Sequence, residues 1–255
     1  MIIPFVKMQG AGNDYIYVGQ TDVASLDLPT LARNLSDRRF GVGSDGLVVI
    51  SQTTDCDAKM TMFNADGSLG NICGNALRCV GKLVTDRTGK DTAVIKTSVG
   101  KRVVYKELNG LFTADMGKYE LLPDFIVGER KYTVVDVGNV HAVTFVDDLN
   151  GLNIEKLSKK TRESERFCGN VNVEFVVKGT GGNAEVRVYE KGSGETFSCG
   201  SGSVAVAVAL KKAGATEKEY VLKFKGGVLK ARIDNGKAYL SGEAKKVFCG
   251  SIDYD

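Results

Sequence analysis

The stretch "ICGNALRC", residues 72–79, decides how this chain is understood. Its first cysteine, Cys73, is followed by Gly-Asn and then by an apolar, helix-like segment. A second stretch, "SCGSGSVAVAVAL", residues 198–210, places Cys199 in the same setting. The two cysteines are 199 − 73 = 126 residues apart, and this distance indicates that the chain contains a repeat.

A shift of 126 residues aligns the two halves of the chain without a gap. "MFNADGSLGNICGN" at 62–75 falls on "VYEKGSGETFSCGS" at 188–201, and Gly12-Asn13 falls on Gly138-Asn139. Glycine-rich turns match one another easily, which is the simplest alternative explanation. Four separated segments share this one register, however, and self-similarity at a fixed spacing indicates a repeated structural unit.

The same order of elements is predicted in each half. A short apolar strand leads into the Gly-Asn turn, and a second strand, a polar helix and two further strands follow. Cys-Gly then opens an apolar helix, over about 75–86 in the first half and about 201–213 in the second. We therefore predict an α+β fold of two pseudo-symmetric domains, each a mixed β-sheet wrapped around a central helix.

Domain limits follow from the repeat. We expect an N-terminal half over 1–118 and a C-terminal half over 119–245, with a loop around Pro123 marking the boundary. The tail, residues 246–255, is expected to pack back on the first half. The functional site is expected in the cleft between the halves.

Composition excludes several classes of function. The 255 residues are 43% hydrophobic and 25% charged, as in a soluble globular protein. The net charge of +3 is too small to indicate a nucleic-acid partner, and no apolar run is long enough to span a membrane. Because the N-terminus lacks a signal-peptide pattern, we expect a cytoplasmic protein. Thiols stay reduced there, so the six cysteines do not indicate a disulfide framework.

The two Cys-Gly sites suggest proton-transfer chemistry. Asn75 and Ser201 are good N-cap residues, so Cys73 and Cys199 are expected just before the N-terminus of a helix. Free N–H groups and the helix dipole there would lower a thiol pKa and could also hold a carboxylate. Two thiols facing one carbon from opposite sides could act as general base and general acid, which inverts a stereocentre.

Other interpretations of these cysteines are weaker. A cysteine is most often a small core residue, as we expect for the other four. Zinc is not expected, because no C-x-x-C occurs and His141 is the only histidine. A Cys–His hydrolase using His141 leaves the second Cys-Gly unexplained. "GVGSDG" at 41–46 matches a dinucleotide-binding pattern, but a helix precedes it and a strand follows, which is the reverse of the required order.

Six segments together resemble the diaminopimelate epimerase family over residues 5 to about 245. They are "KMQGAGNDYIYV", "DRRFGVGSDGLVVI", "MFNADGSLGNICGNALRCV", "VGNVHAVTFVDD", "ERFCGNVNVEF" and "RVYEKGSGETFSCGSGS". The resemblance implies an isomerase that needs no pyridoxal phosphate, metal or other cofactor and that binds a small amino-acid substrate. It also implies the two-domain fold predicted above from the repeat. The oligomeric state is left open, with a homodimer as one option.

The resemblance also implies roles for individual residues. Cys73 and Cys199 correspond to the catalytic base and acid, and Glu190 and His141 to groups that tune them. The residues implied to bind substrate are Asn13, Asn64, Gly74, Asn75, Asn139, Asn172, Lys191, Gly200 and Ser201.

Four positions depart from the family pattern. Lys191 and Asn170 stand where the family has arginines, and Val140 and Ala76 replace a proline and a glycine. Arginine and lysine are not interchangeable where a carboxylate is gripped by two parallel bonds. The sequence therefore favours a racemase for another amino acid, such as histidine. Diaminopimelate epimerase, an enzyme of lysine biosynthesis, is the alternative, and a non-catalytic amino-acid binding protein is a hypothesis from another class.

Overall fold

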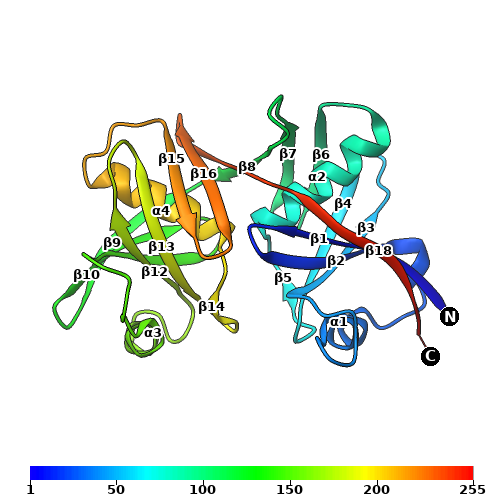
Figure 1. The fold of residues 1–255 in the computed structure, drawn as a ribbon, viewed down its shortest axis with the longest axis horizontal. Coiled ribbons are helices and arrows are strands. Elements are labelled where there is room, and N and C mark those ends of the chain that lie inside the picture. Colours follow the sequence, from blue (N-terminus) through cyan, green and yellow to red (C-terminus); the bar gives the residue numbers. More distant parts are fainter. Residues whose placement is uncertain (255) are drawn as a thin grey trace. The chain divides into compact units, whose positions relative to one another are not determined.

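The computed structural model describes residues 1–254 and divides them into two units (Figure 1). The first unit contains Met1–Ala114 together with the described residues from Gly242 onward. The second unit contains Asp115–Ser241. The division thus falls within two strands, β8 (Phe112–Lys118) and β17 (Lys237–Gly242).

The first unit is a mixed sheet in the order β18-β1-β2-β3-β4-β6-β7-β8, with the short β5 beside β4. The pairs β2/β3 and β4/β6 are parallel, and the other pairs are antiparallel. Besides β8, its strands are β1 Ile2–Gly10, β2 Asn13–Gly19, β3 Gly46–Ser51, β4 Ala58–Asn64, β5 Leu69–Gly70, β6 Thr92–Thr97, β7 Gly100–Lys106 and β18 Lys245–Asp253.

The second unit repeats this topology in the order β9-β10-β11-β12-β13-β15-β16-β17, with β14 beside β13. Its parallel pairs, β11/β12 and β13/β15, occupy the same places in the order. Its strands are β9 Glu120–Val127, β10 Arg130–Asp136, β11 Val140–Phe145, β12 Asn172–Lys178, β13 Asn183–Glu190, β14 Gly194–Thr196, β15 Glu219–Phe224, β16 Gly227–Asp234 and β17 Lys237–Gly242.

Each sheet wraps around one helix. In the second unit this is α4 (Gly200–Lys212), whose residues are buried on every side from Gly200 through Leu210. A helix that is apolar all round belongs in a core, and α4 packs against β10, β11, β12, β15 and β16. In the first unit α2 (Gly74–Thr88) packs against β1, β2, β4, β6 and β7. The predicted fold class is therefore confirmed.

A smaller, polar-faced helix follows the second repeat strand in each unit, as predicted. These helices are α1 (Leu28–Ser36) and α3 (Ile154–Arg162), whose first and last residues are each 126 positions apart. Asp27 caps α1 by accepting from the Thr30 N–H, and Asn153 caps α3 in the same way. The repeat therefore extends to the caps. The remaining helix is the short 3-10 helix η1 (Gln20–Val23).

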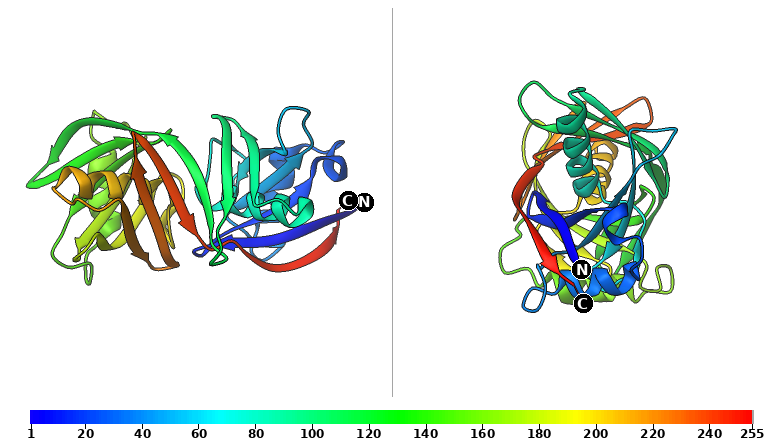
Figure 2. Two further views of the ribbon diagram at one scale, coloured as in Figure 1. Left: turned by 90° about the horizontal axis from the view of Figure 1, so that it is seen from above. Right: turned by 90° about the vertical axis from the view of Figure 1, so that its right-hand side faces the viewer.

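The last strand completes the first unit. β18 pairs antiparallel with β1 from Ile2 to Gln9, and Figure 2 shows the two chain ends side by side. β9 pairs with β10 in the same manner in the second unit. The predicted loop at Pro123 is wrong, because Pro123 lies inside β9. The register with β10 shifts there, which accommodates a residue that has no N–H to donate.

No helix within residues 1–254 is both long and apolar enough to cross a membrane.

Candidate active site

Cys73 and Cys199 are themselves the N-caps of α2 and α4. The Cys73 Sγ accepts from the Ala76 N–H at 3.5 Å, and the Cys199 Sγ accepts from the Gly202 N–H at 3.3 Å. The prediction that Asn75 and Ser201 are the caps is wrong. Each helix begins at the glycine after the cysteine, because the sulfur already satisfies the N–H group three residues on.

Around Cys73, the first unit places amide groups and one buried positive charge. The Cys73 Sγ is 3.2 Å from Asn13 Oδ1, and Asn75 Nδ2 donates to the same oxygen at 3.4 Å. Arg78, which is fully buried, donates to Asn75 Oδ1 at 2.8 Å. Asn13, Gly74 and Asn75 are thus gathered at this helix terminus, as the resemblance implied, and Arg78 is an addition.

Asn64, at the end of β4, has an ordinary structural explanation. Its Nδ2 donates to Ser68 Oγ at 2.9 Å across the turn that follows the strand. This is the turn chemistry for which asparagine is favoured. Its implied part in substrate binding stays a prediction.

Around Cys199, the second unit places acidic groups. Ser201 Oγ is 3.5 Å from the sulfur, and the Glu190 carboxylate both accepts from Thr196 Oγ1 and forms a hydrogen bond with the thiol. Gly200 and Ser201 lie in the first turn of α4, with N–H groups free of helical partners by position. Cys199 and Glu190 are therefore neighbours, and the implied tuning role of Glu190 stays a prediction.

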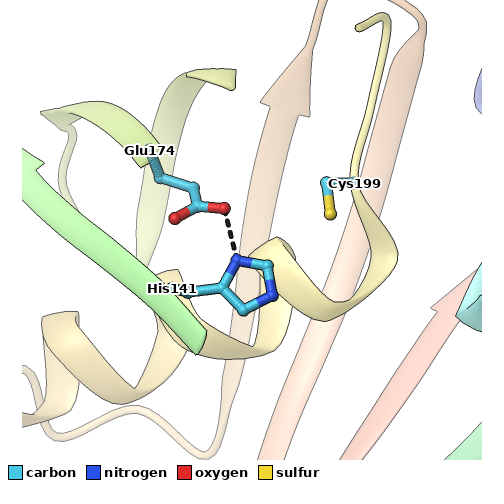
Figure 3. Close-up of side chains that lie close together, drawn as sticks. All are labelled: His141, Glu174 and Cys199. Carbon is cyan, nitrogen blue, oxygen red and sulfur yellow. Dashed lines mark hydrogen bonds and ion pairs between the residues drawn. The ribbon is translucent and has the colours of Figure 1, made fainter. Parts of the chain in front are cut away.

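His141 lies beside these groups and is held by a residue that the sequence did not single out. The His141 Nδ1 is 2.6 Å from Glu174 Oε1, and neither side chain is exposed (Figure 3). One ring nitrogen of His141, one oxygen of Glu174 and the sulfur of Cys199 all lie within 4.8 Å of one another. The three side chains form the His141–Glu174–Cys199 cluster.

The predicted low pKa of the thiols is wrong for Cys199. Burial, and then the negative charges of Glu190 and Glu174, raise its pKa well above the usual value. Hydrogen bonds with Ser201 and the Gly202 N–H act in the opposite direction but do not prevail. The helix terminus was the visible signal in the sequence, whereas burial and the Glu174 carboxylate depend on segments farther along the chain. These surroundings favour the thiol form of Cys199 over the thiolate.

Burial also raises the pKa of the Glu190 carboxyl, despite hydrogen bonds from Thr196 and Cys199 and the nearby charge of His141. A group whose pKa is raised in the folded state favours folding while it is protonated. Its contribution is complete below the unfolded pKa and is lost as the pH rises through the folded pKa.

We expect Glu190→Gln to increase the free energy of unfolding at about pH 8 but not at about pH 4, where both side chains are neutral. The same variant should lose at least about tenfold in turnover, because the carboxylate that is hydrogen-bonded to the Cys199 thiol is replaced by an amide. Urea denaturation at the two pH values measures the first effect. Equal free energies of unfolding for the variant and the native chain at about pH 8 would contradict a raised pKa for the Glu190 carboxyl.

The remaining implied residues lie near the ends of β12 and β13. The Asn172 Oδ1 accepts from the Lys191 N–H at 2.8 Å, and Lys191 Nζ donates to Asn170 Oδ1 at 2.6 Å. The two positions that depart from the family's arginines therefore contact each other. The Asn139 Oδ1 is buried and has no hydrogen-bond partner among residues 1–254. A ligand group could satisfy this oxygen.

The repeat shows how differently the two thiols are surrounded. Subtracting 126 from His141, Glu174 and Glu190 gives Tyr15, Val48 and Asn64. None of these three residues carries a charge at neutral pH. The acidic and imidazole groups thus belong to Cys199 alone, whereas a buried guanidinium belongs to the Cys73 side. A cation favours the thiolate form of a neighbouring cysteine, and anions favour the thiol.

The His141–Glu174–Cys199 cluster offers nitrogen, oxygen and sulfur atoms of the kind that bind zinc. However, the Nδ1 of His141 is already engaged by Glu174 at 2.6 Å. A metal ion using that nitrogen would have to break this bond. The arrangement fits a hydrogen-bonded pair better than a vacant set of metal ligands.

Sequence reasoning missed Glu174 and Arg78. A signal for Glu174 was present, since it is the one acidic residue in the predicted buried strand "VNVEFVV", residues 171–177. Charged residues are almost never fully buried unless they are paired. Arg78 carried the weaker signal of a basic residue within the apolar helix "NALRCV", residues 75–80.

Comparison with known proteins places this chain in a family. The model of the family described as diaminopimelate epimerase matches residues 5–122 and 133–247. The chain is 38% identical over 274 aligned residues to a diaminopimelate epimerase of Acetivibrio thermocellus, with 98% of each chain covered. It is 37% identical to one of Methanococcus maripaludis, covering 98% of this chain and 99% of that one. The predicted class of enzyme, an isomerase of the epimerase type, is confirmed.

Solved structures share the fold at low sequence identity. A phenazine biosynthesis protein of the PhzF family from Bacillus anthracis matches over all of both chains, with a TM-score of 0.76 and 14% identity. A hydroxyproline epimerase from Agrobacterium vitis matches with a TM-score of 0.70 and 13% identity, covering 98% of this chain and 91% of the other.

Proposed function

Because the chain belongs to the diaminopimelate epimerase family, we propose that it inverts one α-carbon of diaminopimelate and does so with two thiols. The observation that carries this proposal is the pair of cysteines, each capping the central helix of its unit. Relatives that are 38% and 37% identical along nearly the whole chain bear the name of this activity. They favour diaminopimelate over histidine, the substrate type preferred from the sequence.

In the proposed reaction one thiolate removes the α-hydrogen and the other thiol protonates the opposite face of the carbon. The charge of the buried Arg78 acts on Cys73 and favours its thiolate, once the thiol has given up the proton that it donates to Asn13 Oδ1. Cys199, beside Glu190, suits the protonated thiol. The first-turn N–H groups of α2 and α4 are donors for the α-carboxylate, on which negative charge accumulates as the proton leaves. In the reverse direction the two thiols exchange roles, as general acid–base catalysis requires.

The distal end of diaminopimelate carries a second carboxylate, for which Lys191 is the proposed partner. Its ammonium group is held by Asn170 at 2.6 Å, so it has a defined position. A hydrogen bond between charged groups contributes about 1.5–3 kcal/mol, which corresponds to roughly ten- to a hundredfold in affinity. A single ammonium provides this attraction without the planar fork of an arginine.

The test is α-hydrogen exchange in deuterated water, followed by NMR, for LL-diaminopimelate and for a panel of L-amino acids that includes histidine. We expect kcat/KM for diaminopimelate to exceed that of amino acids with neutral side chains by roughly ten- to a hundredfold. Lys191→Met should remove most of this preference. A higher kcat/KM for histidine would refute the substrate and return the chain to the racemase interpretation. No exchange with any amino acid would refute the activity itself.

A further inference from the structure

Glu174 is held against His141 by the parallel pairing of β11 and β12. In this register His141 lies opposite Asn172 and Val143 lies opposite Glu174, so the two side chains leave neighbouring strands two residues apart. Both side chains are completely buried, and their contact at 2.6 Å is a short hydrogen bond (Figure 3). All of these atoms belong to the second unit.

The fold does not need a carboxylate at this position. Glu174 Oε2 is buried and has no hydrogen-bond partner among residues 1–254, so the carboxylate is only partly satisfied. A buried charge that is poorly paired costs stability. The equivalent position of the first unit, 174 − 126 = 48, holds Val48, and Tyr15 stands in place of His141. The same fold is thus built there with an apolar residue, which indicates that Glu174 serves the chemistry.

The two ring nitrogens of His141 differ in their hydrogen bonding. The Nδ1 meets the carboxylate, whereas the Nε2 is buried and has no hydrogen-bond partner among the described residues. Which nitrogen carries the proton is set by the bond that the other makes. A carboxylate can only accept, so the proton lies on Nδ1 and the Nε2 lone pair is left as an acceptor.

We propose that Glu174 is a positioning residue, which holds His141 as the Nδ1–H tautomer so that its Nε2 exchanges a proton with the thiol of Cys199. The S–H bond of Cys199 breaks as an N–H bond forms at Nε2, and the reverse step restores both groups. Glu174 stays ionised and offsets the positive charge of the imidazolium. The Cys199 sulfur lies within 4.8 Å of one ring nitrogen of His141 and of one carboxylate oxygen of Glu174. Catalytic contacts of this kind often shorten only in the reacting complex.

The role in turnover rests on the proposed function, but the tautomer does not. His141 is the only histidine of the chain, so NMR of tag-free protein labelled with 15N-histidine reports this ring alone. In the neutral ring we expect Nδ1 to carry the proton and Nε2 to carry the lone pair. A neutral ring that carries its proton on Nε2 would overturn the proposal.

The matching variants are Glu174→Met, which removes the acceptor at similar size, and Glu174→Gln, which removes only the charge. We expect Glu174→Met to lower kcat on the order of ten- to a thousandfold with little change in KM, by analogy with carboxylates that orient a catalytic histidine. Its melting temperature is measured beside kcat, because the variant removes an unpaired buried carboxylate oxygen but also leaves the His141 Nδ1–H without its acceptor. The kcat of Glu174→Gln should lie between that of Glu174→Met and that of the native chain. Glu185→Gln, at an exposed position within β13, is the control and should match the native chain.

A kcat within about twofold of the native value for both Glu174 variants would overturn the role in turnover. If Glu174→Met does not fold, Glu174→Gln and the native NMR spectrum still decide the question. If the native chain turns over no amino acid, the proposed function fails, while the tautomer measurement still tests the role of Glu174 independently.

Discussion

Cys73→Ala and Cys199→Ala should each lower epimerisation by a factor on the order of a thousand or more. Inversion needs a base on one face of the α-carbon and an acid on the other, so one thiol cannot replace the pair. Each substitution also removes an N-cap, because the sulfurs accept from the N–H groups of Ala76 and Gly202. Loss of a cap costs about 0.5–2 kcal/mol of stability.

Serine variants separate the two effects. Cys73→Ser and Cys199→Ser keep a good capping oxygen, so their stability should remain close to that of the native chain. Their epimerisation should still be lost, since a hydroxyl is a far weaker base than a thiolate. Cys249→Ala, at an exposed cysteine of β18, is the control and should keep full activity. An alanine variant of either capping cysteine with nearly native turnover would refute the two-thiol mechanism.

The repeat could be predicted from the sequence, because residues with local structural roles recur at a fixed spacing. Turn glycines, capping residues and the Cys-Gly pairs recur at 126-residue spacing, and α1 and α3 follow that spacing at both ends. What could not be read is the pairing of β18 with β1, or the place of Pro123 inside β9. Both depend on contacts between segments that are distant in sequence, which local patterns do not encode.

Local sequence patterns likewise predict some features of the candidate site and not others. The positions of Cys73 and Cys199 and their glycines at helix N-termini were predictable, because helix termini have a local signature. The charge state of Cys199 was not, because burial, Glu190 and Glu174 determine it together. Local reasoning saw only the helix dipole, which favours thiolate. Sites of catalysis are where several distant groups act on one atom, so the sequence pattern identifies the atom better than its pKa.

A substitution at Gly202 tests how closely Glu174 and Cys199 pack against the first turn of α4. A Cβ added there would lie 2.6 Å from Glu174 Oε1 and 3.1 Å from Cys199 Cβ. The carboxylate cannot retreat freely, because it is bound to His141 at 2.6 Å. Alanine raises helix propensity by about 1 kcal/mol over glycine, but overpacking a core costs about 1–3 kcal/mol. We therefore expect Gly202→Ala to destabilise the chain slightly and to lower kcat by roughly ten- to a hundredfold, because it displaces either Cys199 or the Glu174–His141 pair.

The other half of the repeat supplies the control. Position 202 − 126 = 76 is Ala76, and position 174 − 126 = 48 is Val48, so the first unit has a Cβ and an apolar side chain at the two equivalent positions. Ala76→Gly should cost only about 1 kcal/mol, the difference in helix propensity. In a double-mutant cycle, Glu174→Ala should remove the destabilisation caused by Gly202→Ala, since the obstructing oxygen is gone, while activity stays low. Unfolding in urea measures the coupling. If Gly202→Ala destabilises the chain equally with and without Glu174, the carboxylate is not what keeps position 202 a glycine.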